Sequence, residues 1–396
     1  MHIRNQRLIW TIIVSSFLLW FISVSFASSP GRYIVVFKEP VSDDQKSAII
    51  DHAGGTVIKH LRLITGSAAI LPTDATFRAL SQRAEVKRID EDLIFHATGK
   101  PLPPSPAQVL PWGVATVKAP SAWSISQGGT VKVAILDTGI NLTHPDLQPN
   151  IKGGYNAIKP SKSPNDDNGH GTHVAGIVAA VNNSIGVVGV APQADLYAVK
   201  VLNAGGSGFL SDIIEGLQWC IDNQIRVVNM SLGGDSGNDS EYDAITTAYY
   251  AGIILVAAAG NDGYANSVDY PGAYPEVIAV SAIDNKLQFA SFSSYGPEVD
   301  ITAPGVQVYS TYKTSGYTTM SGTSMATPHV TGVAALRLAQ NENQSPAEIK
   351  WVLQSTATDL GLSADKQGAG LVNAQAVVGY PLFLFAHAEE LIDSRQ

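Results

Sequence analysis

The sequence predicts an α/β fold, a mostly parallel sheet with helices on both faces, preceded by a small α+β domain. Strands of a parallel sheet are buried on both faces, so they form continuous apolar runs. Four such runs follow Pro120: residues 131–136, 196–201, 226–230 and 253–257. Helical segments separate them, at 173–181, 211–222 and 242–251. Strands that alternate with helices in this way are typical of a doubly covered sheet, whose active groups collect at the carboxyl ends of the strands.

The segment upstream predicts a smaller unit of strands and helices. We expect strands at 33–37, 56–63 and 86–95 and helices at 43–52 and 75–82. A unit of about 65 residues is marginally stable alone. Residues 98–106, Thr-Gly-Lys-Pro-Leu-Pro-Pro-Ser-Pro, predict a stiff exposed linker that marks a domain boundary and offers a cutting site.

The first residues indicate an export signal. Arg4 and Arg7 precede an apolar run from Leu8 to Val24, and Ser25-Phe26-Ala27 supplies the small residues of a cleavage site. We therefore expect residues 1–27 to be a signal peptide. An uncleaved membrane anchor is the alternative, because the run approaches the roughly 20 residues that span a bilayer.

Composition narrows the class of protein. Of 396 residues 45% are hydrophobic, which is enough for a large core and excludes a wholly disordered or fibrous chain. The 25 basic and 34 acidic residues give a net charge of -9, which argues against binding to nucleic acid. The single cysteine, Cys220, excludes an intrachain disulfide, and its apolar neighbours predict a buried, inert thiol.

Three polar residues stand where reactive groups are expected. Asp137 directly follows the first strand, His170 lies in Asn-Gly-His-Gly-Thr-His at a helix start, and Ser324 lies in Ser-Gly-Thr-Ser-Met-Ala. Taken singly, each fits a cap, a core histidine or a turn. Together, their chain order of Asp, His and Ser is that of subtilisin.

These and further blocks resemble a bacterial subtilisin-type serine protease precursor over residues 30–380. The blocks are 131–147, 168–191, 230–234, 258–261, 291–305 and 321–335. The resemblance implies five segments: a signal peptide (1–27), an inhibitory propeptide (28–97), the linker (98–106), a catalytic domain (107–380) and a tail (381–396) that has no counterpart. It also implies a secreted, monomeric endopeptidase that cuts extended polypeptides, processes its own precursor, and has no stable membrane association after signal cleavage. The mature chain would begin after Ala97 or nearer Ser105.

The chemistry explains the residue types. A serine hydroxyl needs a base such as His170, and that imidazole needs a carboxylate such as Asp137 to fix its tautomer. The resemblance makes Asn261 and the Ser324 N–H the donors to the oxyanion, and the loss of such a donor is costly in subtilisin itself. It also makes two segments the edges that bind substrate as an added strand: Gly206, Ser207, Gly208 and Ser231, Leu232, Gly233.

The resemblance further implies Ca²⁺ as a cofactor. Its main site would use the side chains of Gln108, Asp146 and Asn183 and the carbonyls of Val181, Ile185 and Val187. Such oxygen ligands suit a hard cation. A weaker site would use Glu298 and Asp300 with carbonyls near Gly272 and Tyr274.

Substrate selection is predicted from the same alignment. It puts Asp269 at the base of the pocket for the side chain before the cut bond, and Asp262 near its rim. We therefore expect Lys or Arg to be accepted better there than in a relative with a neutral pocket. Alternatively, Asp269 points to solvent or joins the weaker cation site.

Two other functions remain open from the sequence. A zinc hydrolase could use His170 and His173, three residues apart, although a third ligand motif is missing nearby. An inhibitor or catalytically silent binder is the non-enzymatic alternative, against which the intact Asp137, His170, Asn261 and Ser324 speak.

Overall fold

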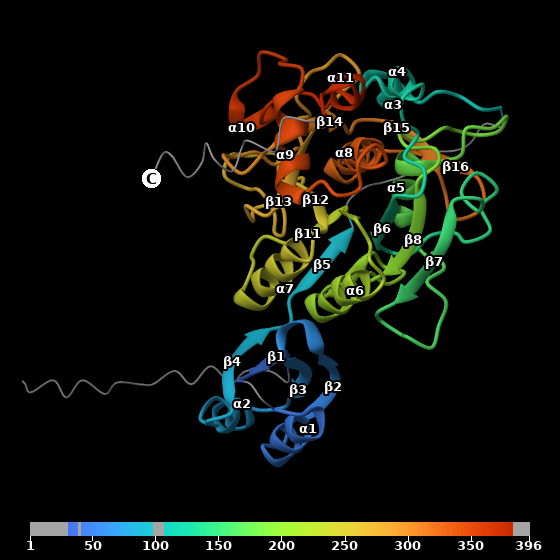
Figure 1. Cartoon of the computed structure of the whole chain (residues 1–396). Coiled ribbons are helices and arrows are strands. Elements are labelled where there is room, and N and C mark those ends of the chain that lie inside the picture. Colours follow the sequence, from blue (N-terminus) through green and yellow to red (C-terminus); the bar gives the residue numbers. More distant parts are fainter. Residues whose placement is uncertain (1–30, 39–40, 98–106, 383–396) are drawn as a thin grey trace, which may run out of the picture.

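The computed structural model describes residues 31–38, 41–97 and 107–382. A large domain carries a small one at one end, and the chain passes between them through a single strand, β5 (Figure 1). The expected signal peptide and linker lie outside the described residues, and so does most of the expected tail, residues 383–396.

The large domain is built on a seven-stranded sheet with the order β14-β13-β12-β10-β6-β8-β7. Every neighbouring pair is parallel. The strands are β6 (Lys132–Asp137), β7 (Ile151–Asn156), β8 (Asp195–Lys200), β10 (Val227–Met230), β12 (Ile254–Ala258), β13 (Val277–Ile283) and β14 (Ile301–Pro304). The prediction of a mostly parallel sheet is confirmed.

Helices cover both faces of this sheet. One face packs on α5 (His170–Ala179) and α8 (Thr323–Leu338), the other on α6 (Leu210–Asp222) and α7 (Asp239–Tyr250). Alternate residues of β6 serve the two cores: Val133 and Ile135 join the α5/α8 side, and Ala134 and Leu136 the α6/α7 side. Burial on both faces is the reason for the continuous apolar runs.

Shorter elements complete the large domain. The helices are α3 (Trp112–Thr116), α4 (Ala119–Ala122), α9 (Pro346–Ser355), α10 (Ala364–Gln367) and α11 (Ala374–Gly379), and β15 (Val308–Thr311) pairs with β16 (Tyr317–Met320). No helix among the described residues is both long and apolar enough to cross a membrane.

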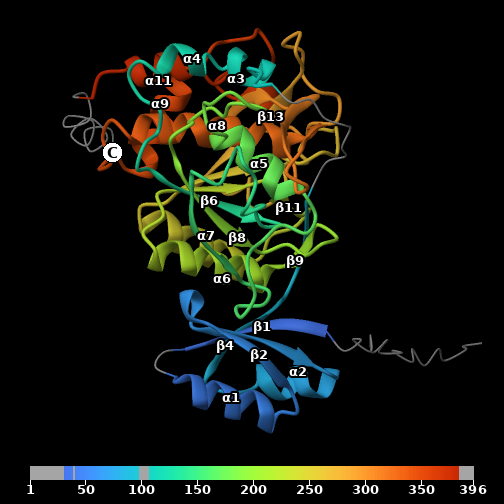
Figure 2. The ribbon, with the colours of Figure 1, turned by 90° about the vertical axis from the view of Figure 1, so that its right-hand side faces the viewer.

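The small domain is an antiparallel sheet of order β2-β3-β1-β4. Its elements are β1 (Gly31–Phe37), α1 (Asp43–His52), β2 (Thr56–Leu61), η1 (Arg62–Ile64), β3 (Gly66–Leu71), α2 (Asp74–Ser81) and β4 (Val86–Glu91). Its two helices cover the outer face, and its inner face is turned toward α6 and α7 (Figure 2).

One predicted strand is wrong. The run 86–95 is not continuous: β4 ends at Glu91 inside the small domain, and β5 (Ile94–Ala97) belongs to a different sheet on the large domain. The break falls at Asp92, whose buried carboxylate accepts hydrogen bonds from the N–H and hydroxyl of Ser211 at the start of α6. A carboxylate is favoured at a helix N-terminus, so this contact ties the two domains together where the strand changes sheet.

Candidate active site

A buried Asp–His pair lies at the carboxyl end of β6. The Nδ1 atom of His170 is 2.8 and 2.9 Å from the two carboxylate oxygens of Asp137. Both residues are buried, with exposed side-chain fractions of 2% and 0%. A proton on Nδ1 held by the carboxylate leaves Nε2 as the basic nitrogen of the ring. The close approach of α5 to the chain that follows β6 depends on Gly171, because a Cβ there would lie 2.2 Å from the Gly139 carbonyl oxygen.

Asp166 positions this pair, and sequence reasoning missed it. One of its oxygens accepts from the hydroxyl of Thr138 and the N–H of Gly169, and the other accepts from the N–H and hydroxyl of Thr172. Its buried carboxylate therefore joins the end of β6 to the first turn of α5. The only sequence signal was its place four residues before His170.

Ser324 lies in the first turn of α8 and is fully buried. Its hydroxyl donates to the carbonyl of Ser231 over 3.1 Å, and the Ser231 hydroxyl donates back to the Ser324 carbonyl over 2.8 Å. Strands β10 and β6 are in register at Asn229 and Ile135, so Ser231 and Asp137 come at matching positions two residues later. The strand ends therefore bring Ser324 to the same edge of the sheet as the Asp–His pair.

Asn261 is held beside Ser324 through its oxygen. Its Oδ1 accepts from the N–H of Thr323 over 2.9 Å and from the Thr323 hydroxyl over 3.2 Å. This fixes the amide plane and leaves Nδ2 as the donor, which has no acceptor among residues 31–38, 41–97 and 107–382.

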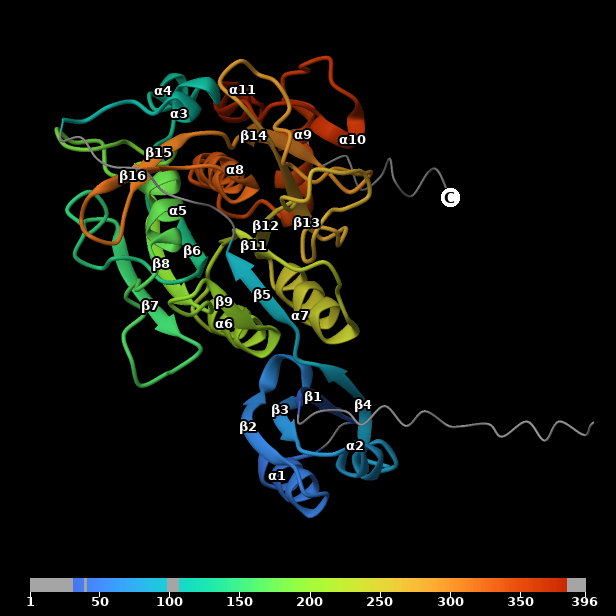
Figure 3. The ribbon, with the colours of Figure 1, turned by 180° about the vertical axis from the view of Figure 1, so that it is seen from behind.

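The chain's own strand β5 lies in the cleft between the two predicted edge segments. It pairs antiparallel with β11 (Leu232–Gly233) on one side and with β9 (Ser207–Phe209) on the other (Figure 3). The pairs include Ala97 with Leu232 and Phe95 with Gly208, and Phe95 is completely buried. Gly206 lies just outside β9, in a turn in which its N–H donates to the carbonyl of Asn203. The geometry is that of a peptide added as a middle strand.

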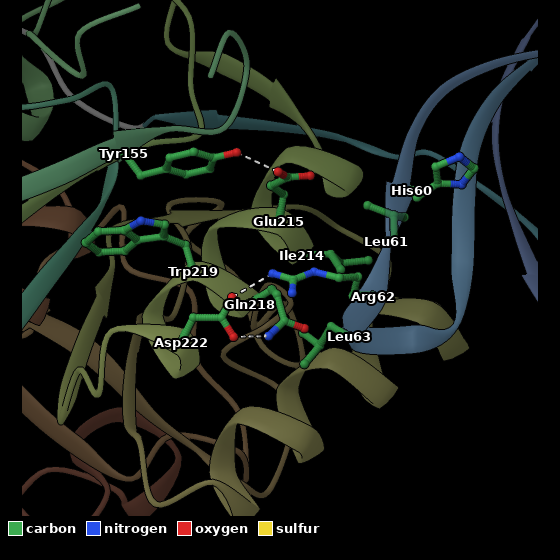
Figure 4. A pocket seen from close by; sticks show the side chains of 10 residues that line it. All are labelled: His60, Leu61, Arg62, Leu63, Tyr155, Ile214, Glu215, Gln218, Trp219 and Asp222. Carbon is green, nitrogen blue, oxygen red and sulfur yellow. Dashed lines mark hydrogen bonds and ion pairs between the residues drawn. The ribbon is translucent and has the colours of Figure 1, made fainter. Parts of the chain in front are cut away.

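The small domain is fastened to α6 by polar contacts. Figure 4 shows a pocket between η1 and α6, where Arg62 reaches Asp222 and Tyr155 donates to Glu215. Nearby, the Lys59 ammonium lies 2.6 Å from the Asp212 carboxylate. Two of these contacts, those of Arg62 and Lys59, cross from one domain to the other, so basic side chains of the small domain meet the acidic surface of the large one.

The residues expected at the main cation site lie together. Asp146 is fully buried, and its carboxylate accepts from the amide of Asn183 and the N–H of Val187. Gln108 accepts through its side-chain oxygen from the Asn183 N–H, and Ile185 donates to the Asn183 side chain. Burial raises the pKa of Asp146, and the hydrogen bonds from Val187 and Asn183 offset only part of that effect.

The residues expected at the weaker cation site are arranged differently, around Asp300. The Lys350 ammonium lies 2.8 Å from the Asp300 carboxylate and donates to the carbonyls of Pro275 and Val277. Glu298 is exposed. The lysine supplies a positive charge to Asp300, so a cation would have to displace it.

The remaining predicted residues are placed as follows. Asp269 is buried and Asp262 exposed, close to one another. Cys220 is a buried free thiol, and burial raises its pKa well above the usual range. His173 is fully buried with its Nε2 on the carbonyls of Val308 and Thr318, and burial lowers its pKa to about 3. The Nε2 of His173 is thus taken up by carbonyls, and the Nδ1 of His170 by Asp137, so these contacts do not support a zinc pair of the two histidines.

A parallel α/β sheet that brings a buried Asp–His pair, a helix-start serine and a strand-binding cleft to one edge has the arrangement of a serine protease. Comparison with known families agrees: residues 128–372 match the subtilase family. The chain belongs to this family and is a subtilisin-like serine endopeptidase, as the sequence predicted.

Named relatives match over most of the chain. Subtilisin NAT of Bacillus subtilis subsp. natto is 44% identical over 358 residues, which cover 88% of this chain and 91% of that protein. Subtilisin E of Bacillus subtilis matches over the same length and to the same extent. Subtilisin Savinase of Lederbergia lenta is 52% identical over 271 residues, 68% of this chain and 99% of that protein.

Proposed function

We propose that Asp137, His170 and Ser324 are the catalytic triad of this endopeptidase. The observation that carries the proposal is the buried pair of Asp137 and His170 Nδ1 beside a cleft that holds a peptide strand. As the Ser324 oxygen attacks a substrate carbonyl carbon, His170 Nε2 takes the hydroxyl proton, and it later gives that proton to the leaving amine. Asp137 holds the imidazole in place and stabilises its positive form.

Asn261 supplies a donor for the oxyanion that forms in this attack. Thr323 holds the Asn261 oxygen, so its Nδ2 is available to the developing charge together with the Ser324 N–H. Donors oriented before the reaction need no reorganisation when the charge appears. Loss of one such donor costs about 10²- to 10³-fold in turnover, a figure taken from subtilisin.

A fluorophosphonate probe tests the nucleophile directly. Applied to the chain after removal of the small domain, it is expected to label Ser324 and to abolish peptidase activity. Ser321→Ala is the matched control, since Ser321 lies on the same loop and accepts from the N–H of Gln307. Labelling that survives Ser324→Ala would contradict the assignment. Inhibition by a zinc-selective chelator without labelling would favour a metal hydrolase instead.

The small domain is an inhibitory propeptide in this proposal. Its β5 occupies both edges of the cleft with the pairing of a bound substrate, so no other peptide can use them at the same time. The enzyme would cut its own chain close to the end of β5, after Ala97 or nearer Ser105, and would then act on other extended polypeptides as a monomer. Recognition through main-chain pairing makes such an enzyme tolerant of sequence.

Calcium is the cofactor that the Asp146 loop would hold. The oxygen ligands present there suit calcium, which is a hard cation. They are the side-chain oxygens of Gln108, Asp146 and Asn183 and the carbonyls of Val181, Ile185 and Val187. The buried Asp146 carboxylate also forms no ion pair with a lysine or arginine among the described residues. The ion would neutralise Asp146 and cross-link a chain that has no disulfide. A second cation site at Glu298 and Asp300 would need Lys350 to move away.

Export follows from the N-terminal signal: the protein would be secreted and act outside the cell.

A further inference from the structure

The last residue of β8 is a buried lysine beside the Asp–His pair. Lys200 lies in register with Asp137, the last residue of β6, on the neighbouring strand. Side chains at paired positions of neighbouring strands project from the same face of the sheet. Lys200 is 5% exposed. The proposed mechanism gives this buried charge no role.

Three hydrogen bonds hold the ammonium of Lys200. It donates to the carbonyl of Thr138 over 2.7 Å, to the carbonyl of Leu202 over 2.8 Å and to the carboxylate of Asp167 over 2.8 Å. An ammonium has three protons to donate, so each of them is used. The N–H of Thr138 also donates to the Asp137 carboxylate over 2.7 Å. Because the backbone of one residue joins these contacts, the ammonium lies within about 10 Å of that carboxylate.

The charge of Lys200 is only partly offset by Asp167. The side chain of Lys200 is 7% exposed and that of Asp167 is 55% exposed. Water and salt screen an exposed charge more than a buried one, so the carboxylate contributes less to the potential inside the protein than the ammonium does. The pair therefore leaves a net positive potential at the ends of β6 and β8, where His170 has to gain and lose a proton.

Other charged and titratable groups also lie near His170. The Asp137 carboxylate contacts the ring and favours its positive form. His173, on the same helix, is neutral, because burial lowers its pKa to about 3. The remaining groups belong to the segment before α5 and to the segment after β15, and they are Asp166, Asp167, Tyr312 and Lys313. Of all these groups, Lys200 is the buried cation.

We propose that Lys200 is a positioning residue of the Asp–His pair, and that its buried charge keeps His170 unprotonated, and so able to act as the base, down to lower pH. The proposal rests on the proposed function of His170 as that base. A cation close to an imidazole disfavours the positive form of the ring and lowers its pKa. The register of β6 and β8 places the cation there, so the effect is built into the sheet rather than into the cleft.

The pH dependence of kcat/KM tests the proposal, because its acidic limb reports the pKa of the base in the free enzyme. The processed protein is assayed on a peptide with an uncharged side chain before the cut bond. Lys200→Gln keeps a donor for the carbonyls but removes the charge, so the limb should move to higher pH by about 0.5 to 1. Well below the limb, kcat/KM should be about three- to tenfold lower than in the parent, and the difference should shrink at high pH.

Two further variants separate charge from packing. Lys200→Arg retains the positive charge, so its limb should stay at the parental pH even if its plateau falls. Lys132→Gln is the matched control, since Lys132 begins β6 and lies about 17 Å from Asp137 along the strand, beyond the reach of a screened charge. Its limb should also stay at the parental pH. A limb that moves equally in Lys200→Gln and Lys200→Arg contradicts an effect of charge.

Asp167→Asn decides the matter if the Lys200 variants do not fold, because Asp167 is exposed. It leaves the ammonium without its counter-charge, so the limb should move the other way, to lower pH. Well below the limb, kcat/KM should then be about twofold higher than in the parent, the size of an exposed ion pair. A limb that stays in place or moves to higher pH in Asp167→Asn overturns the proposal.

A purely structural role for Lys200 predicts a different result. Lys200→Gln and Lys200→Arg would then lose the same share of kcat/KM at every pH and melt at a lower temperature, with their limbs at the parental pH. That outcome overturns the proposal. Labelling of Ser324 by a fluorophosphonate reports the proposed function separately, so a labelled, active Lys200→Gln enzyme with an unmoved limb contradicts this inference alone.

Discussion

The ammonium of Lys59 lies 2.6 Å from the carboxylate of Asp212 and 2.8 Å from the carbonyl oxygen of Ala157, across the boundary between the two domains. Asp212 is buried there, and burial raises its pKa while Lys59 lowers it. Three further ion pairs cross the same boundary, from Lys59 to Glu215, from Arg62 to Asp222 and from Arg88 to Asp243. The small domain is thus held partly by charge.

Lys59→Met is therefore expected to shorten the time for which the cut small domain stays bound. Removing one partner of a buried charge pair costs about 2–5 kcal/mol and acts mainly on dissociation, so release should be at least about tenfold faster. The lag between processing and peptidase activity measures this. Lys38→Met is the control, because Lys38 donates to Ala84 within the small domain. Equal lags in the two variants would show that the Lys59 contact does not retain the domain.

Ser324→Ala is expected to accumulate as an unprocessed chain that keeps its small domain. With the nucleophile gone, β5 stays joined to the chain that follows it. Mass spectrometry and N-terminal sequencing of protein made without other proteases should find a chain that begins near Ser28. Normally trimmed protein from this variant would mean that another enzyme makes the cut.

Removal of calcium is expected to lower the melting temperature and to speed autolysis. A ligand that binds only the folded state adds about 2.7 kcal/mol at a hundredfold excess over its Kd. Asp146→Asn should reproduce the effect of EDTA, and EDTA should add little to it, because the variant and the chelator both abolish the contact between the ion and the Asp146 carboxylate. A parental melting temperature that is the same with and without EDTA, once loss of calcium is verified, would contradict the proposed site.

Selection of Lys is expected to depend on pH through Asp269. Burial, with the charges of Asp262 and Asp235, raises its pKa to about 7, so the carboxyl is mostly neutral below that pH and negative above it. For peptides that differ only in Lys or Phe before the cut bond, the Lys-to-Phe ratio of kcat/KM should therefore rise as the pH increases from about 6 to 8, and the rise should be several-fold smaller in Asp269→Asn. Ratios are used because a change in the rate of the chemical step affects both peptides alike. A flat ratio in the parent would separate Asp269 from Lys recognition.

Much of the fold could be predicted because a strand that is buried on both faces of the sheet is a continuous run of apolar residues in the sequence. Strand β12 lies within one residue of the predicted run 253–257, and α6 within one residue of 211–222. Strand β3 was missed, since its sequence Gly-Ser-Ala-Ala-Ile-Leu has small residues where it pairs with β1 and β2. The separation of β5 from β4 depends on contacts with β9 and β11, more than 100 residues away, which no local pattern encodes.

The residues of the candidate site also fall into those that a local motif predicts and those that only the fold brings together. Asp137, His170 and Ser324 stand in distinctive local motifs, so they could be singled out before any contact was known. Asp166 could not, because its role depends on contacts with Thr138, Gly169 and Thr172 that only the fold brings about. The same holds for Lys350, which reaches Asp300 from 50 residues downstream.

The two ends of the segment 98–106 are anchored at different places. Upstream, Ala97 pairs with Leu232 in the cleft, and downstream, Ala107 forms a bridge with Ile185 while Gln108 accepts from Asn183. In the uncut chain, Gln108 thus already contacts Asn183, which in turn donates a hydrogen bond to Asp146. If the chain is cut within 98–106 as proposed, assembly of the Asp146 loop does not have to wait for the cut. The loop can form first, and cleavage would then release β5 from a large domain in which Ala107 and Gln108 already hold their places.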